Sequence, residues 1–305
     1  MTPLRVGLVA ASILLFFLLP SFATLYTDWL WFTEVGYEQI FVRILSTRLL
    51  LGAAAFALIF GVLFLNIHVA RAALRTRELM VLGPQGLRTI TIDLRRLQPM
   101  FYVGAAAVAL FVSLYASGRW DTWLMARNAV PFGKVDPVLG HDISFYLFQL
   151  PLLHFLQSLA FMAVLLSALA AALAYHVGHS IVLDPQRGLI VSNQARRHLS
   201  LLGAMLFVIL AFRAWLAIPA TLTTPSGVVH GASFVDVYAT IPMQWLLAAV
   251  ALVGAALIVY QTTVTRRWPL IAAIASYFGV LVLGHLYAFA LQRLYVSPNE
   301  QVRET

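Results

Sequence analysis

The stretch DPVLGHDISFYLFQLP gathers residue types that could bind a metal ion, because Asp136, His141 and Asp142 lie within seven residues. Carboxylate oxygens together with an imidazole nitrogen can hold Zn²⁺ or Mn²⁺. A catalytic metal site, however, needs three ligands fixed around an open position, and this spacing does not fix them. A membrane enzyme that uses these three residues is therefore one hypothesis.

The same stretch can also be the entrance to a membrane helix. Gly140 permits a tight turn, and Asp142 is a good N-cap for a helix that begins at Ile143. The aromatic residues that follow are typical of a membrane interface. Pro151 is expected to separate a short interfacial helix from the membrane helix proper. We favour this structural cap over the metal site.

Arg213, in AFRAWLAIP, is the one charged residue well inside a predicted membrane span. A charge in lipid is costly and often functional. Arg213 could extend outward to the interface, pair with an acid such as Asp236 or Asp142, or bind an anionic headgroup or substrate. Arg213 and Asp236 are thus candidate residues for binding a substrate or lipid. No Asp or Glu falls within a predicted span, which argues against proton-relay and cation-coupled transporters.

Histidines offer a weaker case for a cofactor. His68 and His285 could provide two axial ligands to a haem, but their predicted depths in the membrane differ. The sequence contains no cysteine, which excludes thiolate-ligated zinc and iron–sulfur clusters ligated by cysteine. We therefore expect no cofactor: neither a divalent metal nor haem is favoured, whereas bound lipid is compatible with the sequence.

The elements that position these residues must be membrane helices. Of the 305 residues, 61% are hydrophobic and only 10% are charged, far from the balance of soluble domains. The mean hydropathy is +0.87. The net charge of +8 would suggest nucleic acid in a soluble protein, but in a membrane protein it reflects topology. We expect no nucleic-acid partner.

The long apolar runs predict an all-α polytopic membrane protein, a bundle of seven transmembrane helices in residues 1–291. A span needs roughly 20 apolar residues, and the runs are too long and continuous for the strands of a barrel. Residues 1–23 also fit a cleaved signal peptide, in which case six helices would remain. The predicted spans are 4–26, 47–70, 101–118, 152–175, 200–221, 242–261 and 269–291.

Basic residues predict the orientation of the bundle. Links 71–100, 176–199 and 262–268 hold eleven of the twenty lysines and arginines. By the positive-inside rule these links are cytoplasmic, so the N-terminus is inside and the C-terminus outside. The cytoplasmic basic link after the second span also suits the anionic lipids of that leaflet. Its basic residues include Arg71, Arg75, Arg77, Arg95 and Arg96.

Three strings carry a resemblance to a known family: DWLWFTEVGY, DPVLGHDISFYLFQLP and LYVSPNEQVRE. In this order and around seven spans, they resemble the N-terminal membrane region of uncharacterised protein family 0182, large bacterial integral membrane proteins. The resemblance implies a seven-helix bundle followed by a large extracytoplasmic domain, with no established activity. Here the tail 292–305 is expected to be extracytoplasmic, and the large outer domain of the family is expected to be absent from this sequence, which is either a short relative with the membrane half alone or a fragment of a longer chain.

These observations favour a non-enzymatic scaffold or accessory subunit of a membrane protein complex, in the inner membrane of a bacterium. Small-residue faces at 52–55 (GAAA) and 104–109 (GAAAVA) could pack against another membrane protein. The first alternative is a transporter or lipid-handling protein with an outer-side site near Arg213. The second is the membrane enzyme with a metal site at Asp136, His141 and Asp142.

Overall fold

The computed structural model describes residues 3–83, 86–186, 188–223, 225–226 and 229–298. Helices dominate this part of the chain, as the apolar runs predict. The eight α-helices are α1 (Pro3–Glu34), α2 (Glu38–Ala70), α3 (Gln98–Ser117), α4 (Trp120–Arg127), α5 (Leu150–Val177), α6 (Asn193–Ala220), α7 (Ile241–Tyr260) and α8 (Trp268–Leu291).

Short β-hairpins join some of the helices, which the all-α prediction does not include. Each is a two-stranded antiparallel sheet. The strands are β1 (Thr76–Gly83) with β2 (Gly86–Asp93), β3 (Ile181–Asp184) with β4 (Gly188–Val191), and β5 (Pro225–Ser226) with β6 (Val229–His230).

Six helical segments in the described part of the chain are long and apolar enough to cross a membrane. This establishes the chain as a multi-pass membrane protein by the length and composition of its helices. The first predicted span, 4–26, lies within α1, and the count of seven spans stays a prediction. The six segments are Glu38–Ala73, Leu94–Ser117, Phe145–Val177, Asn193–Thr223, Asp236–Tyr260 and Trp268–Val296.

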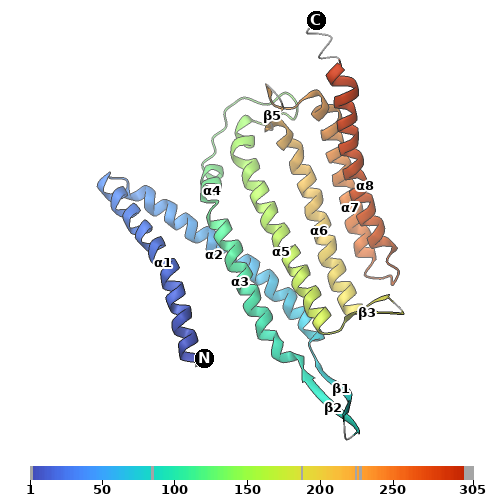
Figure 1. Ribbon diagram of the computed structural model, residues 1–305. Helices are drawn as coiled ribbons and strands as arrows, with labels where there is room; N and C mark the ends of the chain where they lie inside the picture. The colour runs from blue at the N-terminus through green and yellow to red at the C-terminus, as the bar shows by residue number, and fades with distance from the viewer. Residues whose placement is uncertain (1–2, 84–85, 187, 224, 227–228, 299–305) are drawn as a thin grey trace.

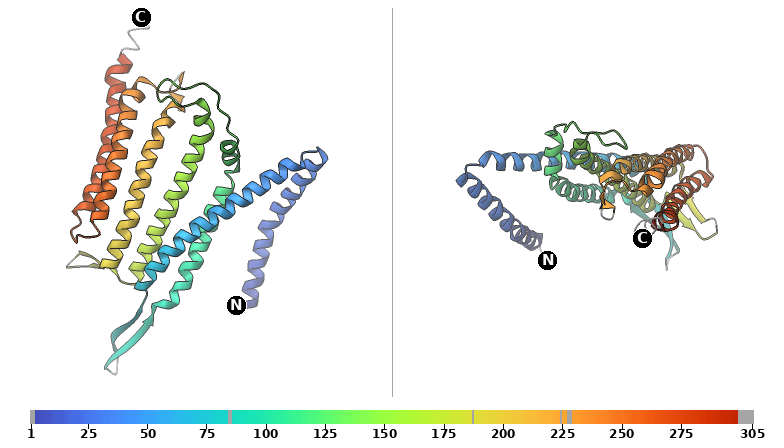
Figure 2. Two further views of the ribbon diagram at one scale, coloured as in Figure 1. Left: turned by 180° about the vertical axis from the view of Figure 1, so that it is seen from behind. Right: turned by 90° about the horizontal axis from the view of Figure 1, so that it is seen from above.

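The helices form an open layer rather than a closed bundle. Helices α5, α6, α7 and α8 pack in chain order, and α2 packs against both α3 and α5. Figures 1 and 2 show α2 crossing the layer diagonally, while α1 folds back from α2 and stands apart from the other helices. With 33 residues, α2 is about 50 Å long, which exceeds a hydrocarbon core of about 30 Å. A tilt of this kind accommodates the extra length.

The two predicted small-residue faces pack against each other in part, while Ala53, Ala54, Gly104 and Ala107 remain exposed. Ala55 on α2 and Ala105 and Ala109 on α3 are at most 5% exposed and belong to one core cluster. A Cβ on Gly52 would lie 3.3 Å from Cβ of Ser117. Small side chains let two helices approach closely. These buried positions hold α2 against α3 and are not free to contact another membrane protein.

Helix α5 begins differently from the prediction. A π-helical turn, Phe145–Gln149, runs directly into α5, so Pro151 does not separate two helices. Pro151 lies in the first turn of α5, where a missing backbone N–H costs little. Helix α7 begins in the same way, with a π-helical turn at Asp236–Thr240 and a proline in its first turn.

The segments that connect the helices lie in two groups, one at each end of the helix layer. The hairpins β1–β2 and β3–β4 and the link between α7 and α8 lie at one end, and α4 and the loop before α5 lie at the other (Figure 1). The three arginine-rich links thus share one end, here called the hairpin end. The orientation of this end toward the cytoplasm stays a prediction.

Candidate functional site

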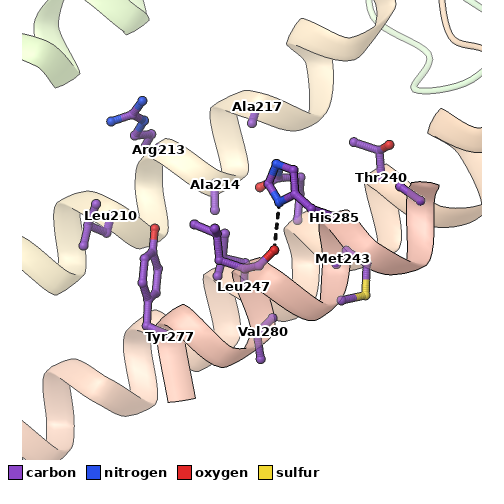
Figure 3. Close-up of a pocket in the computed structure, with 14 residues that line it drawn as sticks. Leu210, Arg213, Ala214, Ala217, Thr240, Met243, Leu247, Tyr277, Val280 and His285 are labelled. Carbon is purple, nitrogen blue, oxygen red and sulfur yellow. Dashed lines mark hydrogen bonds between the residues drawn. The ribbon is translucent and has the colours of Figure 1, made fainter. Parts of the chain in front are cut away.

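A pocket of about 590 Å³ lies between α6, α7 and α8, in the half of the layer away from the hairpin end. Figure 3 shows its lining. Most of the wall is apolar, but each helix or its first turn contributes a polar side chain. These polar side chains are Arg213, Thr240, Gln244, Tyr277 and His285. A mostly apolar pocket with a few convergent polar groups is the usual form of a ligand site.

Arg213 supplies the charge of this pocket. It lies seven residues before the end of α6, about 10 Å along the helix axis. The side chain is exposed, and no hydrogen bond or ion pair joins it to any residue in the described part of the chain. The positive charge of Arg213 lies close enough to His154 of α5 and to Tyr277 of α8 to interact electrostatically with both side chains. In Figure 3 the guanidinium projects from α6 on the side away from Tyr277 and His285.

His285 lines the pocket from α8 (Figure 3). Its Nδ1 lies 2.8 Å from the carbonyl oxygen of Leu281, so Nδ1 carries the proton and donates it to the carbonyl. In the neutral ring this leaves Nε2 as a hydrogen-bond acceptor. The other predicted haem ligand, His68, lies near the hairpin end of α2 and contacts Phe64 of its own helix. The structure therefore places the two histidines at opposite ends of the helix layer.

Asp236, the predicted partner of Arg213, caps the segment that leads into α7. Its Oδ2 accepts hydrogen bonds from the backbone N–H and the hydroxyl of Ser233, at 2.9 and 2.7 Å. Its Oδ1 accepts from the hydroxyl of Thr240, and Ser233 Oγ accepts from the N–H of Asp236. This reciprocal arrangement is a capping box. The Asp236 carboxylate thus accepts hydrogen bonds from residues of its own segment, and one of these residues, Thr240, lines the pocket.

Asp136 organises the loop before α5. Its Oδ1 accepts from the N–H groups of Val138 and Leu139, and its Oδ2 from the N–H of His141 and the hydroxyl of Tyr146 at 2.5 Å. Burial tends to raise the pKa of the Asp136 carboxyl, but these hydrogen bonds outweigh it and hold the pKa below its ordinary value. The hydrogen bonds of the loop therefore stabilise the charged form of the Asp136 carboxyl.

Asp142 acts as a capping side chain beside Asp136. Its Oδ1 accepts from the N–H groups of Ser144 and Phe132, and its Oδ2 from the N–H of Gly133. A metal ion at Asp136, His141 and Asp142 would have to displace these backbone hydrogen bonds. The His141 ring instead lies 4.7 Å from the ring of Phe145. Among the described residues no three His, Asp or Glu side chains are grouped so that they could hold a metal ion.

The order of this loop is expected to depend on pH through Asp142. Hydrogen bonds from the side chain and backbone of Ser144 and from the N–H of Phe132 and Gly133 lower its pKa from 3.8 to about 2. Because the folded pKa lies below the unfolded value, the charged form stabilises the loop above pH 3.8, and this contribution fades as the pH falls toward about 2. The protection of the Gly133 and Ser144 amides against hydrogen exchange, relative to an unfolded chain at the same pH, should fall as the pH falls over this range, whereas an Asp142→Asn variant should show low protection at every pH. Equal pH profiles in both proteins would contradict the prediction.

The predicted basic link lies at the hairpin end. Arg71, Arg75, Arg95 and Arg96 flank the β1–β2 hairpin and are exposed, whereas the side chain of Arg77 lies outside the described part of the structure. Arg75 Nε donates to the carbonyl of Ala72 at 2.9 Å, and the N–H of Arg95 to Oδ1 of Asp93. The link thus presents its charges around the base of a projecting hairpin (Figure 1).

Sequence reasoning identified Arg213 but not the polar residues that share its pocket. Gln244, Tyr277 and His285 lie on other helices, and the sequence does not show which helix faces meet. Gln244 carried a signal, because it is a polar residue early in the apolar run IPMQWLLAAVALV. A polar side chain in a span usually faces protein or a cavity rather than lipid.

Comparison with known proteins gives a consistent family match. A family model described as "Uncharacterised protein family (UPF0182)" matches residues 5–305. The UPF0182 protein of Salinispora arenicola is 35% identical over 315 residues, covering 98% of this chain and 31% of the relative. The UPF0182 protein of Kocuria rhizophila is 33% identical over 301 residues, covering 97% and 30%. That of Moorella thermoacetica is 34% identical over 295 residues, covering 91% and 31%.

The chain spans about a third of the length of these curated relatives. No solved structure matches it. The matches confirm the resemblance carried by the three sequence strings. Because both the family model and the relatives cover nearly the whole chain, this chain belongs to the uncharacterised protein family UPF0182.

Proposed function

We propose that this protein is a non-enzymatic lipid-handling protein of the bacterial inner membrane, which binds an anionic phospholipid in the pocket between α6, α7 and α8. One observation carries the proposal. Arg213 lies within a span, borders a pocket of about 590 Å³, and has no hydrogen-bond or ion-pair partner among the described residues.

The positive charge of Arg213 needs a negative partner. A guanidinium about 10 Å from the end of its helix is costly to leave unpaired near hydrocarbon. Asp236 accepts its hydrogen bonds from Ser233 and Thr240, so it is engaged in a cap. A lipid phosphate matches a guanidinium in charge and in geometry, because its oxygens can accept two parallel hydrogen bonds. The apolar walls of α6, α7 and α8 suit the acyl chains.

The other polar groups that line the pocket add to this fit. Gln244 and Thr240 offer amide and hydroxyl donors, and Nε2 of His285 offers a further hydrogen-bonding nitrogen. A phospholipid headgroup carries hydroxyl or ester groups beside its phosphate, which such side chains can bind. The proposed site therefore pairs one charged contact with several neutral ones.

Replacing Arg213 tests this function. The wild-type protein, reconstituted with equal phosphatidylglycerol and phosphatidylcholine and then re-extracted in mild detergent, should retain phosphatidylglycerol preferentially by native mass spectrometry. Arg213→Gln should lower that retention by about tenfold, the effect of losing a charged hydrogen bond. Arg213→Lys should lose less, because it keeps the charge.

Arg293 provides a matched control for this test. It is exposed at the same end of the layer, where its guanidinium lies 5.7 Å from the ring centroid of Phe289, and it does not line the pocket. Arg293→Gln should retain phosphatidylglycerol as the wild type does. Equal retention in all variants, or equal retention of the two lipids, would remove the lipid-binding function.

A scaffold or accessory subunit is the second candidate, supported by the open helix layer. Helix α1 stands apart from α3 to α8, and Leu49 and Leu50 of α2 are 64% and 72% exposed. Another membrane protein could pack against this side of α2. A photo-crosslinking amino acid at Leu50 should then join the chain to that protein in native membranes. Adducts with lipid alone would contradict the scaffold role.

A further inference from the structure

A second cavity, of about 620 Å³, lies at the hairpin end between α2 and α6. It is called here the α2–α6 groove. Both helices pack on α5, and the last turns of α2 meet the first turns of α6 at this end (Figures 1 and 2). None of its lining residues takes part in the site around Arg213.

A chain of hydrogen bonds fixes the wall of the α2–α6 groove. Asn66 Oδ1 of α2 lies 2.9 Å from Nε2 of His198 on α6, and Nδ1 of His198 lies 3.0 Å from the hydroxyl of Tyr175 on α5. The Asn66 amide nitrogen donates to the carbonyl of Val62, so its oxygen must accept from His198. Nε2 of His198 therefore carries a proton, and in the neutral ring Nδ1 accepts from the hydroxyl of Tyr175, which is 0% exposed.

These bonds give His198 a positioning role. Both of its ring nitrogens are engaged within the protein, so neither is free to bind a ligand. The side chain instead links α2, α5 and α6 and sets the separation of α2 and α6. Gln194 adds a further link, donating from Nε2 to the carbonyl of Val69 at 3.4 Å.

The lining of the α2–α6 groove changes from polar to apolar along α6. Asn193, Gln194 and Arg197 lie in the first turns of α6, and Leu201, Leu202 and Met205 follow deeper in the span. The side chain of Arg197 is exposed and has no hydrogen-bond or ion-pair partner in the described parts of the chain. No Asp or Glu lines the groove among the residues that the structure describes. The groove is thus positively charged at its rim and apolar at its deeper end.

We propose that the α2–α6 groove binds one anionic phospholipid from the leaflet at the hairpin end. Arg197 pairs with the phosphate, the Asn193 amide donates to the headgroup, and an acyl chain lies along Leu201 and Met205. The charge and the polar-to-apolar gradient match the two parts of such a lipid. A soluble phosphate would match the rim but leave the apolar depth without a partner.

This site is independent of the one around Arg213. The two arginines are sixteen residues apart on α6, about 24 Å along the axis and about 160° around it. They therefore lie toward opposite leaflets and on different helix faces. Failure of one site leaves the other unaffected.

Photo-crosslinking locates the lipid. Full-length protein in vesicles of phosphatidylcholine is mixed with a photoactivatable phosphatidylglycerol whose acyl chain carries the reactive group, and labelled peptides are mapped. We expect label in the peptide that contains residues 193–205. Arg197→Gln should lower this label by about fivefold, as expected for one basic side chain at an anionic surface. Label on α8, which reports the Arg213 site, should not change.

Controls separate the groove from general surface charge. Arg71→Gln removes an exposed cation at the same end but outside the α2–α6 groove and should leave the label unchanged. Arg197→Lys should restore part of it. Three results would overturn the proposal: the same label with a phosphatidylcholine probe, the same loss in Arg71→Gln, or no loss in Arg197→Gln. Displacement by excess inorganic phosphate would also overturn it, because the phosphate and not the lipid would then be the ligand.

Discussion

Gly178→Ala is expected to lower the free energy of unfolding by about 3 kcal/mol, a large cost for one added methyl group. Gly178 ends α5, where the chain passes close to the end of α2. A Cβ at this position would lie 2.5 Å from the carbonyl oxygen of Ala73 and 2.8 Å from its carbonyl carbon. Both contacts are with backbone atoms, which cannot rotate away as a flexible side chain could. The end of α5 and the segment after α2 would have to separate.

Gly61→Ala is the matched control for this prediction. Gly61 lies within α2, and a Cβ there would meet no atom within 4 Å. Alanine also favours the helix over glycine, so the control should be as stable as the wild type or slightly more stable. Denaturant titration of the three proteins in one detergent, followed by tryptophan fluorescence, measures the difference. Equal midpoints for Gly178→Ala and Gly61→Ala would show that α5 and the end of α2 are not in close contact.

This contact illustrates what the sequence could and could not predict about the fold. Long apolar runs predicted the membrane helices, because only a helix satisfies its own backbone in lipid. The runs did not show that α2 starts at Glu38, nine residues before the predicted span, because interfacial residues continue the helix beyond the hydrocarbon. They also did not show which helices meet, since Gly178 and Ala73 are distant in sequence.

The β1–β2 hairpin had a local signal that hydrophobicity alone did not reveal. The sequence Thr89-Ile-Thr-Ile-Asp93 alternates polar and apolar β-branched residues, and the sequence Gly-Pro-Gln-Gly, rich in residues that favour turns, precedes it at positions 83–86. Both features are typical of a hairpin. The many arginines nearby favoured a surface segment, which is compatible with a helix or a hairpin, so charge could not distinguish the two.

For the candidate site, too, the sequence identifies a single unusual residue but not the residues that pack around it. Arg213 was identifiable because a charge within an apolar run is rare. Its neighbours Gln244 and His285 come from other helices, and hydrophobic periodicity is weak when lipid and protein are both apolar. The small-residue faces around Ala55 and Ala109 pack in part within the chain, but Ala53, Ala54 and Ala107 are exposed, so contact of these faces with another membrane protein stays a prediction.

Asp136→Ala is expected to destabilise the loop before α5 by about 2 kcal/mol, because several hydrogen bonds to one charged group are lost together. The carboxylate accepts from three backbone N–H groups and from the hydroxyl of Tyr146, which is only 8% exposed. Without it, the Tyr146 hydroxyl is left without an acceptor in a poorly hydrated place. Solvent can replace some of the backbone contacts, which limits the loss. Asp136→Asn should cost less, because the amide keeps one acceptor oxygen.

Limited proteolysis between residues 128 and 144 measures this effect, and the metal content of the same samples tests the enzyme hypothesis. Asp136→Ala should be cleaved faster than the wild type, while Asp121→Ala, whose carboxylate lies on α4 outside this network, should be cleaved at the wild-type rate. If the carboxylates serve only as hydrogen-bond acceptors, no protein should hold stoichiometric zinc or manganese. Zinc that is present in the wild type and lost in Asp136→Ala would instead show that the loop rearranges around a metal ion, with His141 turned away from Phe145.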